Sequence, residues 1–415
     1  MALLEGTLMT IKKIKKHTTI IIQKIPTMTF ELSEEHLAVQ EAARNFAQKE
    51  LLPGVIERDS KMIHPTEQLK KMGELGFLGM MVSEKYGGGG MDTLSYVLAM
   101  EEISKVDNSC SVAMSVNNSL VCWGLETFGT EAQKEKYLRK LATGEWLGAF
   151  CLSEPEAGSD ATSQRTTAID MGDHYVLNGT KNWITNGGSS KVHLVVAQTD
   201  VEKGHRGINV FIVETDWKGV EVSAKEDKLG IRSSDTHTIL YNDVIVPKEN
   251  RIGEDGFGFK FAMKTLGGGR IGIASQALGI AGGAYELASA YAKERVAFGK
   301  PIIQHQGISF KLAVMATEIE ASKMLVYRAA WLKDQHMDYA LAGSQAKLYA
   351  SDVAMRTTVE AVQVHGGYGF VKEYHVERLM RDAKITQIYE GTSEVQKIVI
   401  GRTIEKGQLY VPVAK

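Results

Sequence analysis

The chain has 415 residues, of which 44% are hydrophobic and 24% charged, and its formal net charge is -2. This composition is typical of a globular protein with about two to four domains and a large core. The small net charge excludes an overall basic surface for nucleic acid, and no apolar run approaches the roughly 20 residues that cross a membrane. Cys110, Cys122 and Cys151 have neither disulfide-framework nor metal-ligand spacing, so we expect no metal site and a reducing compartment.

The N-terminal segment of residues 1–29 is expected to be a tail ahead of the first domain. It is rich in lysine, but it lacks the cleavage site of a secretory signal and the arginine and serine content of a transit peptide. Met28 stands just before a helix start at Ser33. Residues 1–27 are therefore interpreted as an upstream-start artefact or a disordered tail, with a targeting role as the alternative.

The next segment, residues 30–148, is predicted to be an N-terminal helical domain. Ser33 is a suitable N-cap, and two glutamates follow it in the first turn, where the helix dipole favours acids. Apolar residues then recur at helical spacing over residues 39–47, and further helical patterns cover residues 94–103 and 131–141.

Residues 149–255 change to the period of β-strands, with little helical pattern between the short runs. Asn178-Gly179 and Asn186-Gly187 are strong turn signals between these runs. The β-rich runs cover residues 175–177, 192–197, 210–213 and 238–246. This arrangement predicts a middle antiparallel β domain rather than a parallel sheet with crossover helices.

Residues 256–415 are predicted to form a C-terminal helical domain. No proline occurs between Pro301 and Pro412, so long helices are uninterrupted. One face of a long helix is marked by Leu312, Met315, Ile319, Ser322 and Val326. We expect a four-helix bundle here, and the fold class is therefore multi-domain α+β, with helical, antiparallel β and four-helix-bundle domains in chain order.

Two motifs of the β segment have the chemistry to bind a flat cofactor. Residues 150–160 alternate small and hydroxyl residues, which exposes backbone N–H groups and serine donors to a heterocycle or a phosphate. Trp183 and Thr185 are two residues apart, so on a regular strand they would share one face. The alternative interpretations are a surface loop for the first motif and a core tryptophan for the second.

Two further motifs contain an arginine beside glycines. Residues 267–272 match G-x-G-x-x-G literally, but no strand precedes them, so we reject a dinucleotide-binding fingerprint. Arg270 in this segment could still reach an anionic or carbonyl ligand. Arg295 ends a predicted helix, where it either contacts a phosphate or only complements the helix end.

The last motifs lie near the C-terminus. Residues 363–370 break a long helix with glycines, and His365 within them is interpreted as structural. Ser393 and Gln396 have capping-box spacing, so a helix N-terminus that can bind a phosphate is expected there. Glu390 just before it has apolar neighbours that would raise its pKa to that of a base, unless it is an exposed turn residue.

Together and in this order, the motifs resemble those of the acyl-CoA dehydrogenase family over residues 28–404. The likeness rests on the loop of residues 152–160, on Trp183-Ile184-Thr185 and on residues 381–394. The resemblance is strongest to the short-chain, butyryl-CoA branch, through residues 265–266, residues 269–281 and residues 381–394.

The resemblance implies FAD as the cofactor and assigns residues to it and to the substrate. Arg295, Phe298 and Gln306 match positions that reach the FAD of a neighbouring subunit, which implies a homodimer at least and the homotetramer of the family. The implied FAD contacts are Phe150, Leu152, Ser153, Gly158, Ser159, Trp183, Thr185, Arg295, Phe298, Gln306, Gln363, Gly366, Gly367, Thr392 and Glu394. The implied substrate contacts are Ser159, Gly267, Arg270 and Gly391.

Glu390 matches the catalytic base of the family. Isovaleryl-like members carry the base immediately before the position of Arg270, where this chain has Gly269, so the resemblance places the base at Glu390. Many members have an aspartate at the position of Gly267, beside the pantetheine arm of CoA. Its absence puts that contact in doubt.

The implied reaction oxidises a short- to medium-chain saturated acyl-CoA to the trans-2-enoyl-CoA, as in fatty acid β-oxidation. Glu390 would take the α-proton while the β-hydride passes to FAD N5, and an electron-transferring flavoprotein would receive the electrons. We expect a cytoplasmic protein, or a mitochondrial matrix protein if the source is eukaryotic, without nucleic acid or membrane insertion. The alternatives are an acyl-CoA oxidase that uses oxygen and a non-catalytic flavin or acyl-CoA binding module.

Overall fold

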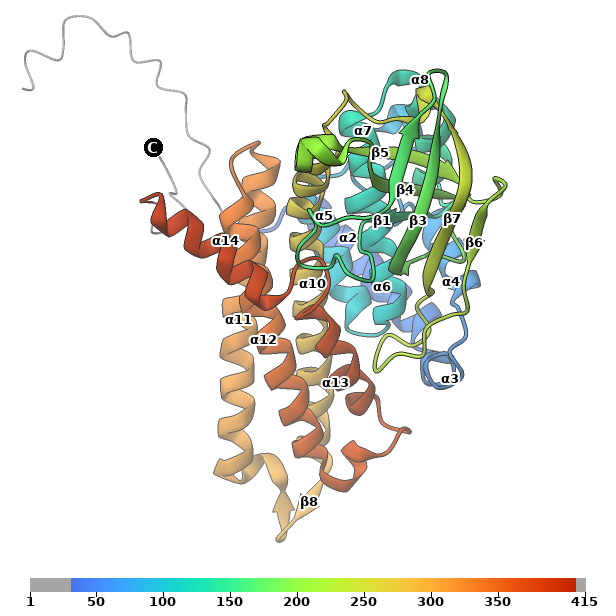
Figure 1. Ribbon diagram of the computed structural model, residues 1–415. Helices are drawn as coiled ribbons and strands as arrows, with labels where there is room; N and C mark the ends of the chain where they lie inside the picture. The colour runs from blue at the N-terminus through green and yellow to red at the C-terminus, as the bar shows by residue number, and fades with distance from the viewer. Residues whose placement is uncertain (1–30, 408–415) are drawn as a thin grey trace, which may run out of the picture. The chain divides into compact units, whose positions relative to one another are not determined.

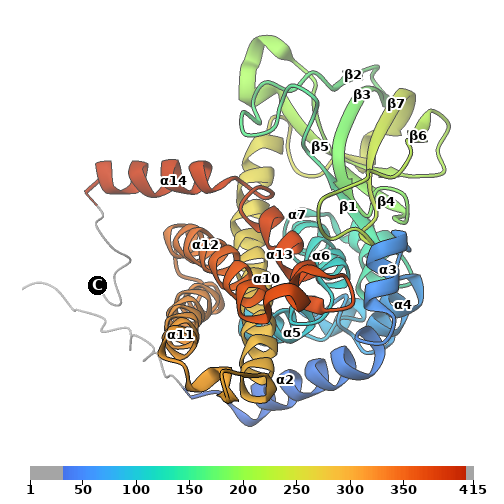
Figure 2. The ribbon, with the colours of Figure 1, turned by 90° about the horizontal axis from the view of Figure 1, so that it is seen from below.

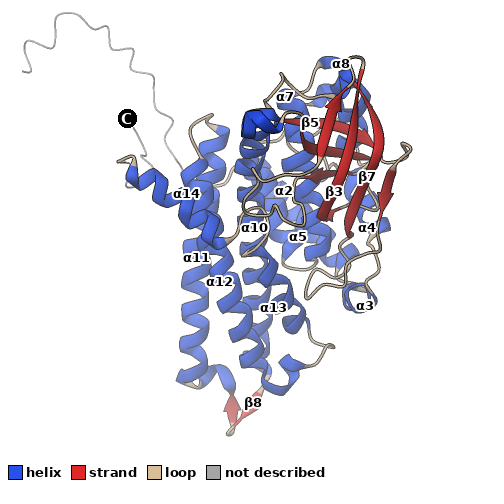
Figure 3. Cartoon of the chain, viewed as in Figure 1, coloured by secondary structure: helices blue, strands red, loops and turns tan. Residues whose placement is uncertain are grey.

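The structure is a computed structural model that describes residues 31–407. Its secondary structure follows the predicted order of helices, a β-sheet and helices again, as Figure 1 and Figure 3 show. The expectations for the tail of residues 1–29 lie outside the described residues. The domain limits of 30–148, 149–255 and 256–415 remain predictions.

The N-terminal helices begin where the sequence places the first cap. Ser33 accepts a hydrogen bond from the backbone N–H of His36, and the His36 side chain bonds back to the Ser33 backbone, so the two residues form a capping box. The helices are α2 (Glu34–Phe46), η1 (Ala47–Leu51), α3 (Val55–Lys61), α4 (Thr66–Glu74), η2 (Glu84–Tyr86), α5 (Thr93–Ser104), α6 (Asn108–Ser115), η3 (Val116–Cys122), α7 (Trp123–Phe128), α8 (Glu131–Gln133), η4 (Lys134–Leu138) and α9 (Arg139–Ala142). Of these, η1, η3 and η4 are π-helical segments.

The middle strands form one seven-stranded sheet in the order β1-β4-β2-β3-β7-β6, with β5 paired to β4. The strands are β1 (Gly148–Cys151), β2 (Thr167–Asp170), β3 (His174–Thr185), β4 (Val192–Gln198), β5 (Ile208–Glu214), β6 (Val220–Val222) and β7 (Thr236–Pro247). Two 3-10 turns, η5 (Val201–Gly207) and η6 (Lys248–Asn250), flank β5 and β7.

The prediction of an antiparallel sheet is correct for four of the pairings and wrong for two. The pairs β2–β3, β3–β7, β4–β5 and β6–β7 are antiparallel, whereas β1 and β2 run parallel to β4. A parallel pair needs a long connection between its strands. Such a connection separates β1 from β4, and pairing over that distance leaves no local turn signal in the sequence.

The turn predicted at Asn178-Gly179 is also wrong, because both residues lie inside β3. The register against β7 shifts between Leu177 and Gly179, which marks a bulge rather than a hairpin. A Cβ on Gly179 would lie 2.5 Å from the Thr166 Oγ1 atom, so glycine is required by a close backbone approach. The turn at Asn186-Gly187 is confirmed.

The C-terminal helices α10 to α13 form the predicted bundle, and Figure 2 shows it from below. The elements are α10 (Gly258–Glu294), β8 (Val296–Ala297), β9 (Lys300–Pro301), η7 (Ile302–Gln304), α11 (Gln306–Asp334), α12 (Ala340–His365), η8 (Gly366–Phe370), α13 (His375–Thr386) and α14 (Ser393–Glu405). Residues 267–269 lie inside α10, which confirms that they are no dinucleotide-binding loop. The predicted apolar face of α11 is buried at Leu312, Met315, Ser322 and Val326.

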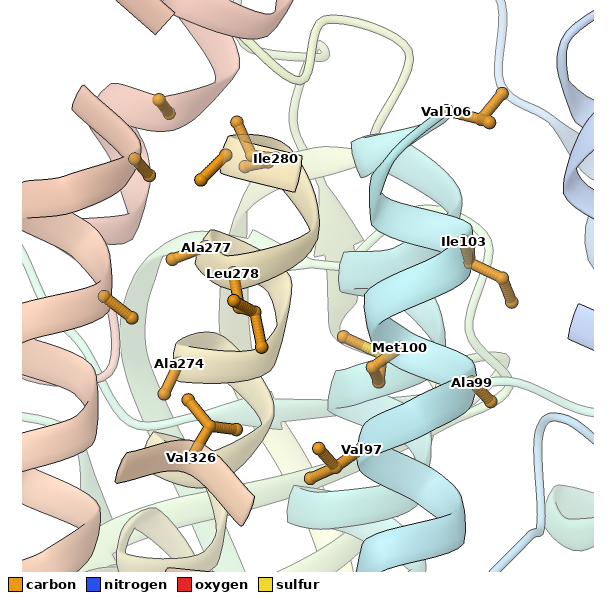
Figure 4. Close-up of a cluster of buried hydrophobic side chains, with 14 of the residues drawn as sticks. Val97, Ala99, Met100, Ile103, Val106, Ala274, Ala277, Leu278, Ile280 and Val326 are labelled. Atoms are coloured by element: carbon orange, nitrogen blue, oxygen red, sulfur yellow. The ribbon is translucent and has the colours of Figure 1, made fainter. Parts of the chain in front are cut away.

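One hydrophobic core joins the N-terminal helices to the bundle. Val97 and Met100 of α5 lie beside Leu278 of α10, and Val326 of α11 lies in the same cluster (Figure 4). Burial of such side chains stabilises the fold by roughly 1.5–3 kcal/mol each. The core therefore fixes α10 against the N-terminal helices.

The last helix corrects the predicted capping box. The N-cap of α14 is Thr392, whose side chain accepts a hydrogen bond from the Val395 backbone, and not Ser393. Gln396 instead donates from Nε2 to the Gly391 carbonyl oxygen. Thr392 and Ser393 are both good caps, and the tertiary contacts of the preceding turn decide between them. No helix of residues 31–407 is both long and apolar enough to cross a bilayer.

Candidate active site

A cavity of about 180 Å³ lies where the first strand, the end of β3, the middle of α10 and the α13–α14 connection meet. We call it the Glu390 cavity. Ten of the predicted site residues line it: Phe150, Leu152, Ser153, Gly158, Ser159, Trp183, Thr185, Arg270, Glu390 and Gly391. Segments far apart in the sequence are thus brought together as the resemblance implies.

The first wall is the loop of residues 152–160, which we call the Ser153 loop. It lies over Lys181, a fully buried side chain of β3. The Lys181 Nζ atom donates to the Leu152 carbonyl oxygen at 3.1 Å, to Glu154 Oε1 at 2.7 Å and to Gln164 Oε1 at 3.2 Å.

The Glu154 carboxylate completes this support. It accepts hydrogen bonds from the Arg165 backbone N–H at 2.6 Å and the Thr166 backbone N–H at 3.1 Å. Burial alone would raise the pKa of Glu154, but the Lys181 charge and these hydrogen bonds outweigh it and lower that pKa. Glu154 is therefore ionised, and the buried ion pair fixes the start of the Ser153 loop.

Trp183 and Thr185 line the cavity from the end of β3. The regular strand alternation assumed for them is wrong, because the register against β7 shifts between Lys181 and Ile184. Trp183 has a φ of 57°, a conformation that costs a non-glycine residue roughly 1–3 kcal/mol. This bulge leaves the Trp183 side chain 59% exposed, so its ring is available to a ligand.

A second wall is the turn of residues 387–392 between α13 and α14, which we call the Glu390 turn (Figure 1). Glu390 has a φ of 54° and Gly391 a φ of 96°, so two successive residues adopt left-handed conformations. Lys347 of α12 donates to the Thr386 carbonyl oxygen at 2.9 Å and to the Gly391 carbonyl oxygen at 2.8 Å. These contacts hold both ends of the strained segment.

The Glu390 carboxylate lies against α10 at Gly269. Any Cβ at position 269 would overlap Glu390 Oε2 and would come within 2.8 Å of Leu120 Cδ2. The Oε2 atom is buried and has no hydrogen-bond partner among the described residues. Burial raises the pKa of Glu390 to about 7, although the charges of Lys347 and Arg270 counteract part of that effect. A carboxylate with this pKa can accept a proton near neutral pH.

Arg270 lies on α10 and also faces the cavity. Its side chain is buried, its Nε atom has no hydrogen-bond partner among the described residues, and its contact with Ser344 Oγ is long at 3.4 Å. Burial lowers the pKa of the guanidinium, and Glu390 opposes that effect. Free donors of a buried cation can bind an oxygen atom of a ligand.

The remaining predicted residues do not meet in the Glu390 cavity. Arg295, Gly366 and Gly367 line a separate cavity of about 520 Å³ beside Tyr291 and Tyr368, which we call the Arg295 cavity. Six others lie outside both cavities: Gly267, Phe298, Gln306, Gln363, Thr392 and Glu394. Phe298 is 96% exposed on the β8–β9 hairpin. Gly267 faces Tyr339, whose Cε2 atom lies 3.7 Å from the position of a Cβ.

Several lining or supporting residues were missed. One apolar wall of the cavity comes from helices whose sequence pattern predicts only a hydrophobic core. Its residues are Val112, Val116, Leu120 and Leu266. Lys347 offered one signal, because it interrupts the buried face of α12 that includes Gly343, Ala350 and Ala354. A lysine on an apolar helix face marks a buried charge whose partner must lie elsewhere in the fold.

Three family models match successive parts of the chain. The N-terminal domain of acyl-CoA dehydrogenase matches residues 33–145, its middle domain residues 149–244 and its C-terminal domain residues 256–405. The Glu390 cavity has lining residues in all three matched parts. The matches therefore cover the complete cavity.

Named proteins are similar over nearly the whole length. The short-chain specific acyl-CoA dehydrogenase of Clostridium acetobutylicum is 50% identical over 377 residues, which are 91% of this chain and 100% of the relative. The structure of butyryl-CoA dehydrogenase from Megasphaera elsdenii has a TM-score of 0.90 and 49% identity, and the match covers 91% of this chain and 100% of that one. A chain in a structure of the electron transferring flavoprotein of Acidaminococcus fermentans has the same TM-score and identity, over 91% and 99% of the two chains.

Proposed function

The chain belongs to the acyl-CoA dehydrogenase family, and from this premise we propose that it oxidises a short- to medium-chain saturated acyl-CoA to the trans-2-enoyl-CoA with Glu390 as the base. One observation carries the proposal: the Glu390 carboxylate, whose buried Oε2 atom has no hydrogen-bond partner in residues 31–407, lines the same cavity as the exposed Trp183 side chain. A candidate base and an aromatic side chain that could stack on a cofactor therefore line one cavity.

The chemistry of the cavity lining supports a bound flavin as the cofactor. Trp183 provides an aromatic face, and Thr185 and Ser153 provide hydroxyl groups. Gly158 borders open space, because no atom beyond its chain neighbours lies within 4 Å of the position that a Cβ would take there. These residues, with Phe150, Leu152 and Ser159, would hold the flavin by stacking and by hydrogen bonds to its polar edge. When bound, FAD supplies the acceptor for the hydride that leaves the substrate.

Glu390 is suited to remove the α-proton of a thioester. No donor among the described residues bonds to its Oε2 atom and competes with a substrate C–H group, and Gly269 leaves the space that the carboxylate occupies. With a pKa near 7, much of the Glu390 carboxylate is ionised at neutral pH and can accept a proton. The carboxylic acid formed by the transfer is also well populated at that pH.

The backbone of the Glu390 turn supports the same step. The Glu390 N–H makes no hydrogen bond to another described backbone group, so it is free to donate to the thioester carbonyl oxygen. Negative charge grows on that oxygen as the α-proton leaves. Donors of this kind typically contribute about 3–4 kcal/mol to an enolate-like transition state.

The apolar wall supports a short acyl chain as substrate. Val112, Val116, Leu120 and Leu266 line the cavity beside Glu390 and expose no polar group from their side chains. An alkyl chain gains roughly 0.8 kcal/mol for each CH2 group buried against such a wall. The similarity to short-chain and butyryl-CoA dehydrogenases supports the same size class.

Arg295, Gly366 and Gly367 support a cofactor shared between subunits. They lie in their own cavity, apart from Trp183, although the family resemblance assigns all of them to FAD. A second copy of the chain would reconcile the two positions, so we propose a homodimer that pairs into a homotetramer. The match to a chain in an electron transferring flavoprotein structure supports such a protein as the electron acceptor.

The test is anaerobic titration of the FAD-loaded protein with butyryl-CoA, followed by the visible absorbance of the flavin. We expect the wild type to lose that absorbance and the Glu390→Gln variant to keep it. Loss of a general base should lower turnover by about 10²–10⁴-fold. Glu405→Gln, which changes an exposed glutamate at the end of α14, is the matched control and should behave like the wild type.

Near wild-type reduction of the flavin in Glu390→Gln would contradict the assignment of the base. Absence of reduction by any acyl-CoA in the wild type would indicate a binding module instead. Peroxide formation without an added acceptor would indicate an oxidase.

A further inference from the structure

Lys347 is a fully buried lysine that the proposed reaction does not use. It lies on the face of α12 that packs into the bundle, and its exposed fraction is 0%. No carboxylate of the described residues lies within ion-pair distance of its Nζ atom. Within residues 31–407, its hydrogen bonds run only to the carbonyl oxygens of Thr386 and Gly391, on either side of Glu390 in the sequence.

These two contacts span the strained part of the Glu390 turn. Thr386 is the last residue of α13, so its carbonyl group is one of those that a helix end leaves without an intrahelical partner. The Gly391 carbonyl oxygen also accepts a hydrogen bond from Gln396 Nε2 at 2.9 Å. Lys347 thus joins the end of α13 to the residue directly after Glu390 and fixes the direction of the intervening backbone.

The charged and titratable groups around Glu390 come from four elements. Lys347 of α12 and Arg270 of α10 are the two cations that stabilise its ionised form, and the effect of Lys347 is the larger. Tyr96 of α5 and Tyr389 of the turn are buried phenols whose pKa values are raised by burial, so both stay neutral. Lys347 is itself charged at pH 7, because burial lowers its pKa only to about 8.

We propose that Lys347 is a positioning residue for the reaction, which holds the Glu390 backbone in its left-handed conformation and keeps a positive charge near the Glu390 carboxylate. The inference rests on the proposed role of Glu390 and adds a second residue to it. A neutral donor could make the same hydrogen bonds to two carbonyl groups at a smaller desolvation cost. The ammonium is therefore explained by its charge as well as by its hydrogen bonds.

The test compares Lys347→Met with the wild type in the pH dependence of flavin reduction by butyryl-CoA under anaerobic conditions. Methionine has a similar length but neither charge nor donors. We expect the limb in which the rate rises with pH to move to higher pH by about one unit or more, because loss of a nearby cation disfavours the carboxylate. From a starting pKa of about 7, that shift alone lowers the rate at pH 7 about fivefold.

Lys333→Met is the matched control. Lys333 is another lysine of the bundle whose pKa burial lowers to about 8, but it contacts Met81 and Trp123 instead of the Glu390 turn. Removal of Lys333 should not change the pH range over which the rate of flavin reduction rises. If Lys347→Met does not retain FAD, the shorter Lys347→Gln, which also lacks the charge, supplies the same measurement.

The proposal would be overturned if Lys347→Met lowered the rate of flavin reduction at every pH without moving the pH range in which the rate rises. A purely structural role of Lys347 predicts that result. A limb that moves equally in Lys333→Met would overturn it too. Failure of the proposed function is distinguishable, since it would appear as normal flavin reduction in Glu390→Gln.

Discussion

The Ser153 loop and the Glu390 turn line the same cavity, and each is held by a fully buried lysine. The two lysines differ in their partners. Lys181 forms an ion pair of 2.7 Å with Glu154, which is itself hydrogen-bonded to the backbone of the next loop segment. In the described part of the chain, Lys347 binds only carbonyl oxygens, and the Oε2 atom of the nearby Glu390 carboxylate has no hydrogen-bond partner.

This difference separates two uses of a buried charge. The Lys181 charge is neutralised by Glu154, which lowers the pKa of that glutamate and removes it from proton transfer. The Lys347 charge is not neutralised at contact distance, so the Glu390 pKa stays near 7. A paired lysine therefore fixes a loop, whereas an unpaired lysine can fix a turn and still leave a carboxylate basic.

The largest expected effect is on stability, from Lys181→Met. Removal of the lysine leaves the Glu154 carboxylate buried without its counter-charge, and breaking a buried pair in this way typically costs about 3–5 kcal/mol. The measurement is the free energy of unfolding of the FAD-loaded protein in urea. Lys347→Met should cost less, because no carboxylate loses a paired partner and one of the two carbonyl groups keeps Gln396.

A double variant sharpens the same prediction. Lys181→Met combined with Glu154→Gln removes both charges, so it should recover part of the stability lost in Lys181→Met alone. Equal losses in the single and double variants would show that the pair contributes through packing and not through its charges.

A smaller effect, on turnover, is expected from Gly269→Ala. The new Cβ would overlap Glu390 Oε2 and must displace the carboxylate, while alanine itself favours the helix by about 1 kcal/mol. We expect turnover to fall roughly 100-fold, which is about 2.7 kcal/mol, with FAD retained and stability nearly unchanged. The measurement is the rate of flavin reduction by butyryl-CoA.

Gly282→Ala is the control for that variant. Gly282 lies on the same helix, and a Cβ there would meet only the flexible Lys105 side chain at 3.4 Å. Both alanine variants should be equally stable, and only Gly269→Ala should be slow. Normal turnover in Gly269→Ala would mean that the carboxylate can act from another position.

The fold was predictable where its signals are local. The Ser33 cap, the apolar face of α11 and the helix end before Arg295 are read from neighbouring residues, and all three are confirmed. The errors arise where distant segments decide. Asn178-Gly179 has the composition of a turn but bulges inside β3, and β1 pairs in parallel with β4, where Gly148 lies opposite Val192, 44 residues later in the chain.

The candidate site was predictable from family motifs more than from physical patterns. Ser153, Trp183 and Glu390 each had an ordinary structural interpretation, and only their order along the chain favoured a shared site. Lys347 was missed because its partners are the backbone carbonyl groups of Thr386 and Gly391. No side-chain pattern in a sequence identifies a contact with backbone groups of a distant turn.

The smallest expected effect comes from Gln396→Leu, which weakens the Glu390 turn without touching either lysine. Gln396 Nε2 donates to the Gly391 carbonyl oxygen, and its Oε1 atom is buried without a partner, so one hydrogen bond is lost and one unsatisfied acceptor is removed. The net cost should be about 1 kcal/mol, seen as a fall in the free energy of unfolding. Because Lys347 still binds Gly391, flavin reduction should slow only a few-fold and its pH limb should not move. A limb that moved in Gln396→Leu as far as in Lys347→Met would mean that the shape of the turn, and not the lysine charge, sets the pKa of Glu390.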